Sequence, residues 1–185
     1  MQPPTDTIPC PHEIVERLWR QLGLSVPTFE FVAPDKLPEA YRRLLVHESG
    51  MTATLERRWG EPMVIELLAD DIVVDLGALF RFVVLRTRDT GLAVELATIR
   101  IPIEAFPGQL RRSFAEGLRP FGALLEEAGI KFRGQPIGYF QLAADALAAA
   151  KANVPTGVPL YGRINHLIGE NGSLLCETAE ILPRA

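Results

Sequence analysis

The apolar positions along the chain change their spacing near residue 60. Before that point they recur every three to four residues, in stretches that proline or glycine separates. This spacing predicts amphipathic helices, because residues three and four apart lie on the same side of a helix. The predicted helices cover residues 11–22, 38–47 and 52–59. We interpret residues 1–10 as a proline-rich tail, and residues 24–36 as a connector.

After residue 60 apolar and polar positions alternate, which predicts β-strands. The predicted strands are 63–68, 79–87, 92–101, 130–142, 161–168 and 173–182. Turn sequences at 88–91 and 170–172 predict two hairpins. Further helices are predicted at 107–116, 120–128 and 143–152. Strands joined by hairpins, with helices inserted between them, favour an antiparallel sheet in an α+β domain over a parallel fold.

Composition narrows the class of protein. The 185 residues suit one compact domain, and 48% of them are hydrophobic, which is ample material for a core. A net charge of −4 is not typical of nucleic-acid-binding proteins, so we expect no nucleic-acid partner. We see neither a signal peptide nor an apolar stretch of the roughly 20 residues that span a bilayer. We therefore expect a soluble cytoplasmic protein with no membrane partner, either a monomer or a small homo-oligomer.

Motifs for common metals and cofactors are missing from the sequence. Cys10 and Cys176 are too few for a disulfide framework, and Cys176 falls in an apolar strand where a reduced thiol packs like a small hydrophobic group. The three histidines share no short motif, so no zinc-binding pattern exists. The glycine-rich nucleotide motifs and the hydrolase nucleophile motif are also absent. We expect neither a metal nor a cofactor.

Arg81 is the first candidate for a binding residue. Alternation in the predicted strand 79–87 places it on the face of Val83, while Phe80 and Phe82 occupy the other face. Both faces of this strand therefore look at least half-buried. A buried guanidinium needs a carboxylate partner or an anionic ligand, because burying it unpaired is costly. Arg81 is thus either part of a structural ion pair or an anion-binding residue.

Two carboxylates lie in the last predicted strand, which is otherwise mostly apolar. Alternation places Glu177 on one face and Glu180 on the other, so one of them should face the interior. A β-bulge between Gly172 and Pro183 would exchange their faces. Which glutamate points inward therefore stays open. Arg163, at the start of the preceding strand, could form an ion pair or contact a ligand.

The start of the predicted helix 120–128 could also contact a ligand. A helix N-terminus offers free backbone N–H groups to an anion, and Gly122 would let a ligand approach the backbone. The alternative is an ordinary proline-started helix with Phe121 in the core. Met51, which precedes another predicted helix, could likewise line a pocket or belong to the core.

Taken together, these residues resemble the chorismate lyase (chorismate pyruvate-lyase) family. The motifs are Met51-Thr52 with Leu55-Glu56, the strand with Arg81, Pro120-Phe121-Gly122, and Leu160-Tyr161-Gly162-Arg163 followed by Leu182-Pro183. They occur in the family's order over about residues 37–183. The resemblance implies a chorismate lyase-like domain at 37–185, preceded by a tail, helix and connector at 1–36. It also implies one antiparallel sheet of about six strands, with helical flaps over a buried ligand pocket.

The resemblance also implies an enzyme. The reaction would be the elimination of pyruvate from chorismate to give 4-hydroxybenzoate, as in ubiquinone biosynthesis, without cofactor or metal. The implied catalytic residues are Glu180, Glu177 and Arg81, and the implied substrate-binding residues are Arg81, Met51, Phe121, Gly122 and Arg163. One departure concerns Ala179, which holds the ungapped position of the family's glutamate. Either Glu180 or Glu177 would have to replace that glutamate.

Two other functions remain open. The first is a related enzyme acting on another small aromatic or enol-ether acid, with Ala179 and Phe121 as adaptations. The second is a non-catalytic module that binds a small carboxylate in the same pocket, since effector domains of some bacterial transcription regulators share this fold. The single short helix predicted before residue 37 is not a winged-helix DNA-binding domain. We therefore expect the enzyme.

Overall fold

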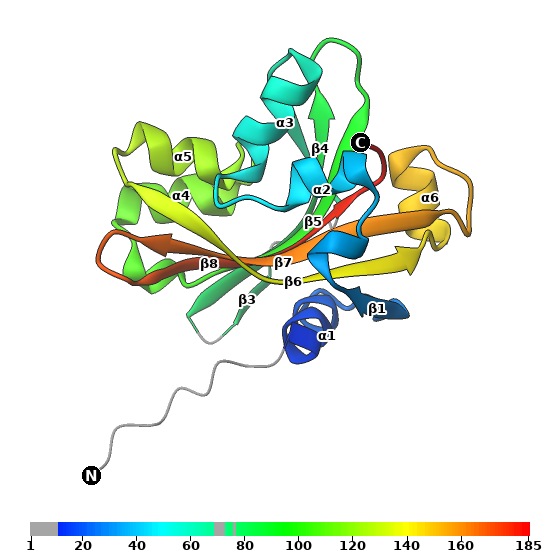
Figure 1. Cartoon of the computed structure of the whole chain (residues 1–185). Helices are drawn as coiled ribbons and strands as arrows, with labels where there is room; N and C mark the ends of the chain where they lie inside the picture. The colour runs from blue at the N-terminus through cyan, green and yellow to red at the C-terminus, as the bar shows by residue number, and fades with distance from the viewer. Residues whose placement is uncertain (1–10, 69–72, 76) are drawn as a thin grey trace.

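The structure is a computed structural model that describes residues 11–68, 73–75 and 77–185. The expected tail at 1–10, with Cys10, lies outside the described residues. One antiparallel sheet runs through the molecule, with helices on both of its faces (Figure 1). The helices are α1 (Pro11–Gln21), α2 (Glu39–Leu45), α3 (Met51–Trp59), α4 (Gly108–Glu116), α5 (Phe121–Glu127) and α6 (Ala146–Ala152), with short 3-10 turns at Pro34–Lys36 and Ile103–Ala105.

The sheet has eight strands in the order β1-β6-β7-β8-β5-β4-β2, and β3 pairs with β4 beside β2. The strands are β1 (Phe29–Val32), β2 (Met63–Leu67), β3 (Val73–Asp75), β4 (Ala78–Thr87), β5 (Ala93–Ile101), β6 (Phe132–Ala143), β7 (Pro159–Gly169) and β8 (Leu174–Leu182). The predicted α+β class with a single antiparallel sheet is confirmed.

The sheet has more strands than the sequence predicted. The connector contributes β1, which pairs with the edge of β6, and β3 pairs with the start of β4. Both are short, at four and three residues. An alternating pattern cannot be recognised over so few positions. Pairing with the edge of a longer strand holds these two segments in an extended conformation.

Alternation along β4 gives the sheet two buried faces. Phe80 and Phe82 pack on one side against α1, which contributes a stripe that includes Leu18, and α6 covers the same side. Leu79 and Val83 pack on the other side, where α2, α3, α4 and α5 form the covering layer. The sheet is thus the middle of three layers, and the candidate site residues lie on either side of it.

Gly162 lets β7 and β8 lie close together near the middle of the sheet. A Cβ atom at this position would come within 2.5 Å of the Glu180 carbonyl oxygen and 2.6 Å of Cζ of Phe140. Only glycine fits such an approach without moving backbone. The next residue is Arg163, so this glycine helps to position that side chain opposite Glu180.

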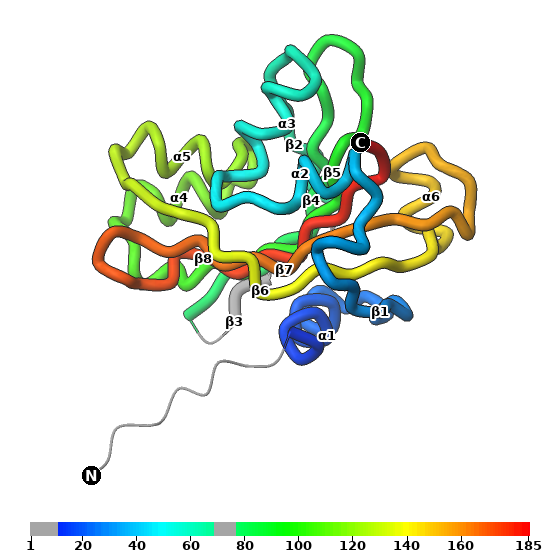
Figure 2. Tube along the Cα trace, in the orientation of Figure 1, coloured from blue at the N-terminus to red at the C-terminus, as the bar shows by residue number. Residues whose placement is uncertain are grey.

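The C-terminus lies beside α2 and α6 (Figure 2), where Arg184 donates a hydrogen bond to the Ala152 carbonyl. Tyr41 of α2 and Tyr161 of β7 bring their ring centroids within 4.7 Å of each other. These contacts fasten α2 to the sheet next to the candidate site. Among the helices of the described residues, none combines the length and apolar character needed to cross a bilayer.

Candidate functional site

A cavity of about 370 Å³ lies between the sheet and helices α3 and α5. Met51 at the start of α3 and Phe121 with Gly122 at the start of α5 form part of its wall, and β5 and β8 supply its floor. This volume is within the range of pockets that hold small molecules, roughly 300–1,000 Å³. The structure therefore brings together Met51, Phe121 and Gly122, which the sequence singled out separately, at one hollow.

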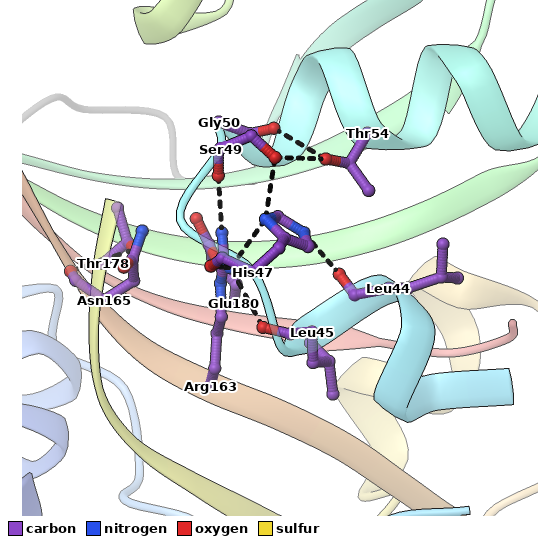
Figure 3. Close-up of polar contacts among 10 residues, drawn as sticks. All are labelled: Leu44, Leu45, His47, Ser49, Gly50, Thr54, Arg163, Asn165, Thr178 and Glu180. Atoms are coloured by element: carbon purple, nitrogen blue, oxygen red, sulfur yellow. Dashed lines mark hydrogen bonds and ion pairs between the residues drawn. The ribbon is translucent and has the colours of Figure 1, made fainter. Parts of the chain in front are cut away.

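Arg163 and Glu180 form a fully buried ion pair at the cavity floor. Nε of Arg163 donates to Oε2 of Glu180 at 2.5 Å. Nη1 donates to the carbonyls of Leu45 and His47, both at 3.0 Å, and Nη2 donates to the Ser49 carbonyl at 3.4 Å (Figure 3). Arg163 therefore holds the loop between α2 and α3 against the sheet, while its partner Glu180 also lines the cavity.

His47 stiffens this loop as a neutral ring. Its Nε2 lies 2.8 Å from the Leu44 carbonyl oxygen, and its Nδ1 lies 3.0 Å from the Ser49 hydroxyl (Figure 3). These partners fit a tautomer that donates from Nε2 and accepts at Nδ1. Burial, together with the positive charge of Arg163, lowers the pKa of His47 below its ordinary value.

Glu95 of β5 is a second carboxylate at the cavity, and the sequence analysis missed it. Its side chain is 3% exposed, and no described residue forms a hydrogen bond or an ion pair with it. Burial, and then the charge of Glu180, raise the pKa of Glu95 well above the ordinary value, while Arg163 opposes the rise. The signal in the sequence was a lone carboxylate in the apolar stretch 92–97.

Glu177 lies on the opposite face of the sheet, away from the cavity. Arg17 of α1 donates to both of its carboxylate oxygens, Nη1 of Arg100 donates to Oε1 at 3.1 Å, and Nε2 of His166 is 3.7 Å from Oε2. Burial alone would raise the pKa of Glu177, but His166, Arg17 and Arg100 together bring it below the ordinary value. Glu177 therefore anchors α1 to the sheet.

A β-bulge in β8 accompanies this arrangement. Ile168 of β7 pairs with Leu174 and Leu167 pairs with Cys176, which leaves Leu175 as an extra residue. From Cys176 onward the strand alternates regularly, so that Cys176, Thr178 and Glu180 all line the cavity. The choice between the two glutamates, which the sequence left open, is thus decided by the tertiary structure in favour of Glu180 at the cavity.

Arg81 lies on the cavity side of the sheet but is not among the residues that line the cavity. It is 1% exposed and sits opposite Ile99 of β5, which does line it. None of its three guanidinium nitrogens has a hydrogen-bond partner among the described residues. Burial lowers the pKa of Arg81 to about 10, and Cys176 opposes this in part, so the group remains charged at neutral pH. An anion-binding role for Arg81 stays a prediction.

Asn165 of β7 is another buried polar residue on this side of the sheet. It is fully buried, and neither atom of its side-chain amide has a partner in the part of the chain that the structure describes. Its backbone carbonyl accepts a hydrogen bond from the Thr178 hydroxyl at 3.4 Å (Figure 3). The floor thus combines apolar side chains with a few buried polar groups, an arrangement typical of small-molecule sites.

Comparisons with known proteins identify the fold. No family model matches the chain, and no curated protein matches it in sequence. Solved structures do match. PhnF from Mycobacterium smegmatis superposes with a TM-score of 0.59 at 20% identity, over 77% of this chain and 67% of PhnF. The effector domain of PhnF gives 0.57 at 19% identity, over 74% and 88% of the two chains.

A regulator from Escherichia coli CFT073 gives a TM-score of 0.51 at 13% identity, over 65% of this chain and 96% of that one. At such identities the likeness is one of fold. The fold is the chorismate lyase-like fold of the C-terminal domains of GntR-family proteins. The fold expected from the resemblance is therefore confirmed, whereas membership of the chorismate lyase family itself is not.

These findings correct the expectation of an enzyme. The structures that share the fold include an effector domain and a regulator, and they point away from chorismate lyase catalysis. The lyase reaction, its substrate and products, and the link to ubiquinone biosynthesis are therefore wrong. The reason is that the matched motifs specify a sheet with flaps over a pocket, and this architecture does not determine a reaction. The catalytic roles expected for Glu180, Glu177 and Arg81 are accordingly not carried forward.

The exclusion of nucleic acid as a partner is corrected as well. Regulators of the GntR family act with DNA through an N-terminal domain, which conflicts with that exclusion. The net charge of −4 describes this chain alone, so it does not exclude DNA as a partner.

Proposed function

We propose that this chain is the effector-binding domain of a transcription regulator, and that a small organic molecule binds in the cavity beneath α3 and α5. The observation that carries the proposal is a cavity of about 370 Å³ whose lining includes the buried acids Glu95 and Glu180, on a fold that the PhnF effector domain shares. DNA is then a partner of the whole regulator, contacted by a DNA-binding domain. This chain supplies the response to the small molecule.

The contacts around Arg163 provide a physical route from the ligand to the rest of the molecule. Glu180 faces the cavity and also holds Arg163, and Arg163 in turn holds the loop between α2 and α3. A ligand that engages Glu180 changes how firmly this loop is held. A ligand shifts an equilibrium only through such differential contacts, so the loop and α3 are where we place the response.

Thermal unfolding with a panel of small polar compounds tests the proposal. Gly122→Leu adds a side chain at the cavity wall, where a Cβ meets only Phe132 at an ordinary contact of 3.8 Å, so this variant should fold with a blocked cavity. Gly108→Leu is the matched control, because a Cβ there meets nothing within 4 Å and the residue does not line the cavity. We expect ligands to raise the melting temperature of wild type and Gly108→Leu, but not of Gly122→Leu.

Two results would overturn the proposal. One is that no class of small compound stabilises the wild-type chain. The other is that Gly122→Leu responds as strongly as the control, which would locate binding outside this cavity. If a ligand is found, fusing the chain to a DNA-binding domain should make the affinity for the cognate operator depend on that ligand.

A further inference from the structure

We infer that the ligand of this cavity carries an ammonium or amidinium group, held between the carboxylates of Glu95 and Glu180. The inference rests on the proposed function and narrows its ligand to organic cations. It departs from the small carboxylate ligand expected from the sequence. The charge of the ligand follows from which charged groups inside the cavity still have unused hydrogen-bonding capacity.

The two carboxylates belong to adjacent strands and line the same cavity. Ala97 of β5 is paired with Glu180 of β8, and Glu95 lies two residues from Ala97 along β5. Glu95 and Glu180 are therefore diagonal neighbours, a relation in which Cα atoms lie roughly 7–8 Å apart and long side chains can reach a common point. A single cationic group of the ligand can contact both of them.

Glu95 is a buried acid without a partner. It is 3% exposed and lines the cavity, and no described residue forms a hydrogen bond or an ion pair with it, although the positive charge of Arg163 favours its ionised form. A buried polar group without a hydrogen-bond partner costs free energy. Glu95 therefore marks a place where a group of the ligand would bind. Because burial and the charge of Glu180 raise its pKa, Glu95 takes up a proton readily in the empty cavity. A cationic ligand would replace that proton.

The arginines near the cavity do not offer an equivalent site for an anion. The donors of Arg163 are committed to Glu180 and to loop carbonyls, and Arg81 does not line the cavity. Arg88 and Arg119 are exposed residues at its rim, and Arg119 is ion-paired with Glu127. The guanidinium of Arg81, which has no hydrogen-bond partner among the described residues, lies outside the lining. The buried charged side chains that do line the cavity are the acceptors Glu95 and Glu180, which call for a ligand that donates hydrogen bonds and carries positive charge.

An organic cation fits better than a metal ion. Among the described residues, no group of three or more His, Cys, Asp or Glu side chains could hold a metal. The remaining wall includes the apolar side chains of Met51, Leu85 and Phe121. These apolar side chains can pack against the carbon skeleton of an organic amine, whereas a metal ion would make no contact with them.

Four probes of one size separate the possibilities. Benzylamine and benzamidine are cations at pH 7, benzyl alcohol is neutral, and benzoate is an anion. We expect the two cations, at about ten times their Kd, to raise the melting temperature of the full chain by about 3–6 °C. Benzoate and benzyl alcohol should have no comparable effect.

Glu95→Gln is the critical variant, because it keeps the shape of the side chain and removes its charge. We expect it to raise the Kd for benzylamine at least about tenfold, because the neutral amide cannot replace the charge-assisted hydrogen bond to the carboxylate. Glu116→Gln is the matched control, since Glu116 is an exposed glutamate that does not line the cavity. Circular dichroism of both variants checks that they fold.

The outcomes distinguish this inference from the proposed function. If benzoate stabilises the chain and the amines do not, the cavity still binds small molecules, and only the inference of a cation is overturned. The inference also fails if Glu95→Gln binds benzylamine as tightly as wild type. If no probe stabilises the chain, the inference is overturned, and the compound panel with Gly122→Leu then decides the proposed function separately.

Discussion

At the scale of single residues, Glu95 and Glu180 show how neighbours set the state of chemically identical side chains. Both are buried at one cavity, but Glu180 has the guanidinium of Arg163 at 2.5 Å while Glu95 has no such contact among the described residues. Burial disfavours the charged form of both acids, and only Glu180 has a contact that offsets this cost. The two residues therefore differ in ion pairing although they line the same cavity.

Glu95→Gln is expected to stabilise the protein without ligand at neutral and higher pH. The raised pKa means that folded Glu95 retains a proton which the unfolded chain has released, so wild-type stability falls as pH rises above the ordinary glutamate pKa of about 4.3. We therefore expect Glu95→Gln to have a higher free energy of unfolding than wild type at pH 7, with a difference that grows between about pH 4 and pH 7.

Urea unfolding of wild type and Glu95→Gln at several pH values measures this difference. It should disappear by about pH 3, well below the ordinary glutamate pKa of about 4.3, where the carboxylic acid is protonated in both states. Exposed Glu126→Gln should change the free energy of unfolding by no more than about 0.5 kcal/mol. A Glu95→Gln variant that is less stable than wild type at pH 7 would show that Glu95 has a partner which stabilises its charge.

Arg163→Met is expected to destabilise the fold by about 3–5 kcal/mol. It leaves Glu180 buried without its ion-pair partner, and it frees the loop carbonyls that Arg163 holds. Arg42→Met is the matched control, because the ion pair of Arg42 with Glu39 is exposed to solvent and should contribute little to stability. Equal losses in urea unfolding of the two variants would contradict a structural role for the buried pair.

At the scale of elements, α1 is held to the sheet by one apolar stripe and one buried carboxylate. Leu18 is fully buried against the sheet, and Arg17 of the same helix bonds Glu177 of β8. Glu177 and Glu180 are three residues apart on β8 and therefore face opposite sides, so this strand connects the layer with the cavity to the layer with α1. Helix packing here depends on the alternation of one strand.

Arg17→Met should loosen α1 while leaving the cavity side intact. We expect faster hydrogen exchange of the α1 amides and a loss of roughly 1 kcal/mol, because Arg17 is partly exposed and solvent weakens its ion pair. The lowered pKa of Glu177 means that the stabilisation exists above the ordinary glutamate pKa and is lost as pH falls through the folded value. The effect of the substitution should therefore shrink in acid.

Arg20→Met provides the control on the same helix, since Arg20 is exposed and pairs with Glu16 one turn away. Its exchange rates should stay close to those of wild type. If both variants speed up hydrogen exchange of the α1 amides equally, the stability of the helix depends on its total positive charge and not on the bond from Arg17 to Glu177.

At the scale of the whole molecule, one sheet is shared by two apolar cores. Leu55 of α3 belongs to the core on the cavity side, and Leu18 of α1 belongs to the core on the opposite side. Residues of β4 alternate between these cores, so neither can lose its packing without disturbing the strand that the other requires. This arrangement favours a single cooperative unfolding transition.

Leu55→Ala and Leu18→Ala test this cooperativity. Both side chains are fully buried, so each truncation should cost about 2–5 kcal/mol in the same transition. Circular dichroism and tryptophan fluorescence should give coincident unfolding curves for both variants. Separate transitions, with one core melting before the other, would contradict the shared-sheet argument.

The periodicity of the sequence predicted most of the fold, because each long element buries a face that its own residues encode. The helix at Pro11–Gln21 and the hairpin ending in Leu182 occur close to where the pattern placed them. The short strands β1 and β3 were not predicted, because their extended conformation depends on pairing with a neighbouring strand edge and not on their own sequence pattern. The motifs also led to the right fold and to the wrong activity, since a pocket shape is compatible with catalysis and with binding.

What the sequence determined by itself was the alternation that makes a two-faced antiparallel sheet. For Met51 and Phe121 it left a place in a pocket and a place in the core both open. Only the tertiary structure decided which carboxylates share that pocket. Strand pairing brings Glu95 next to Glu180 across 85 positions of sequence (180 − 95). Glu177, on the opposite face of the same strand, accepts a hydrogen bond from Arg17 of α1. Electrostatic state depends on distances between groups that folding alone brings together, and no local pattern contains those distances.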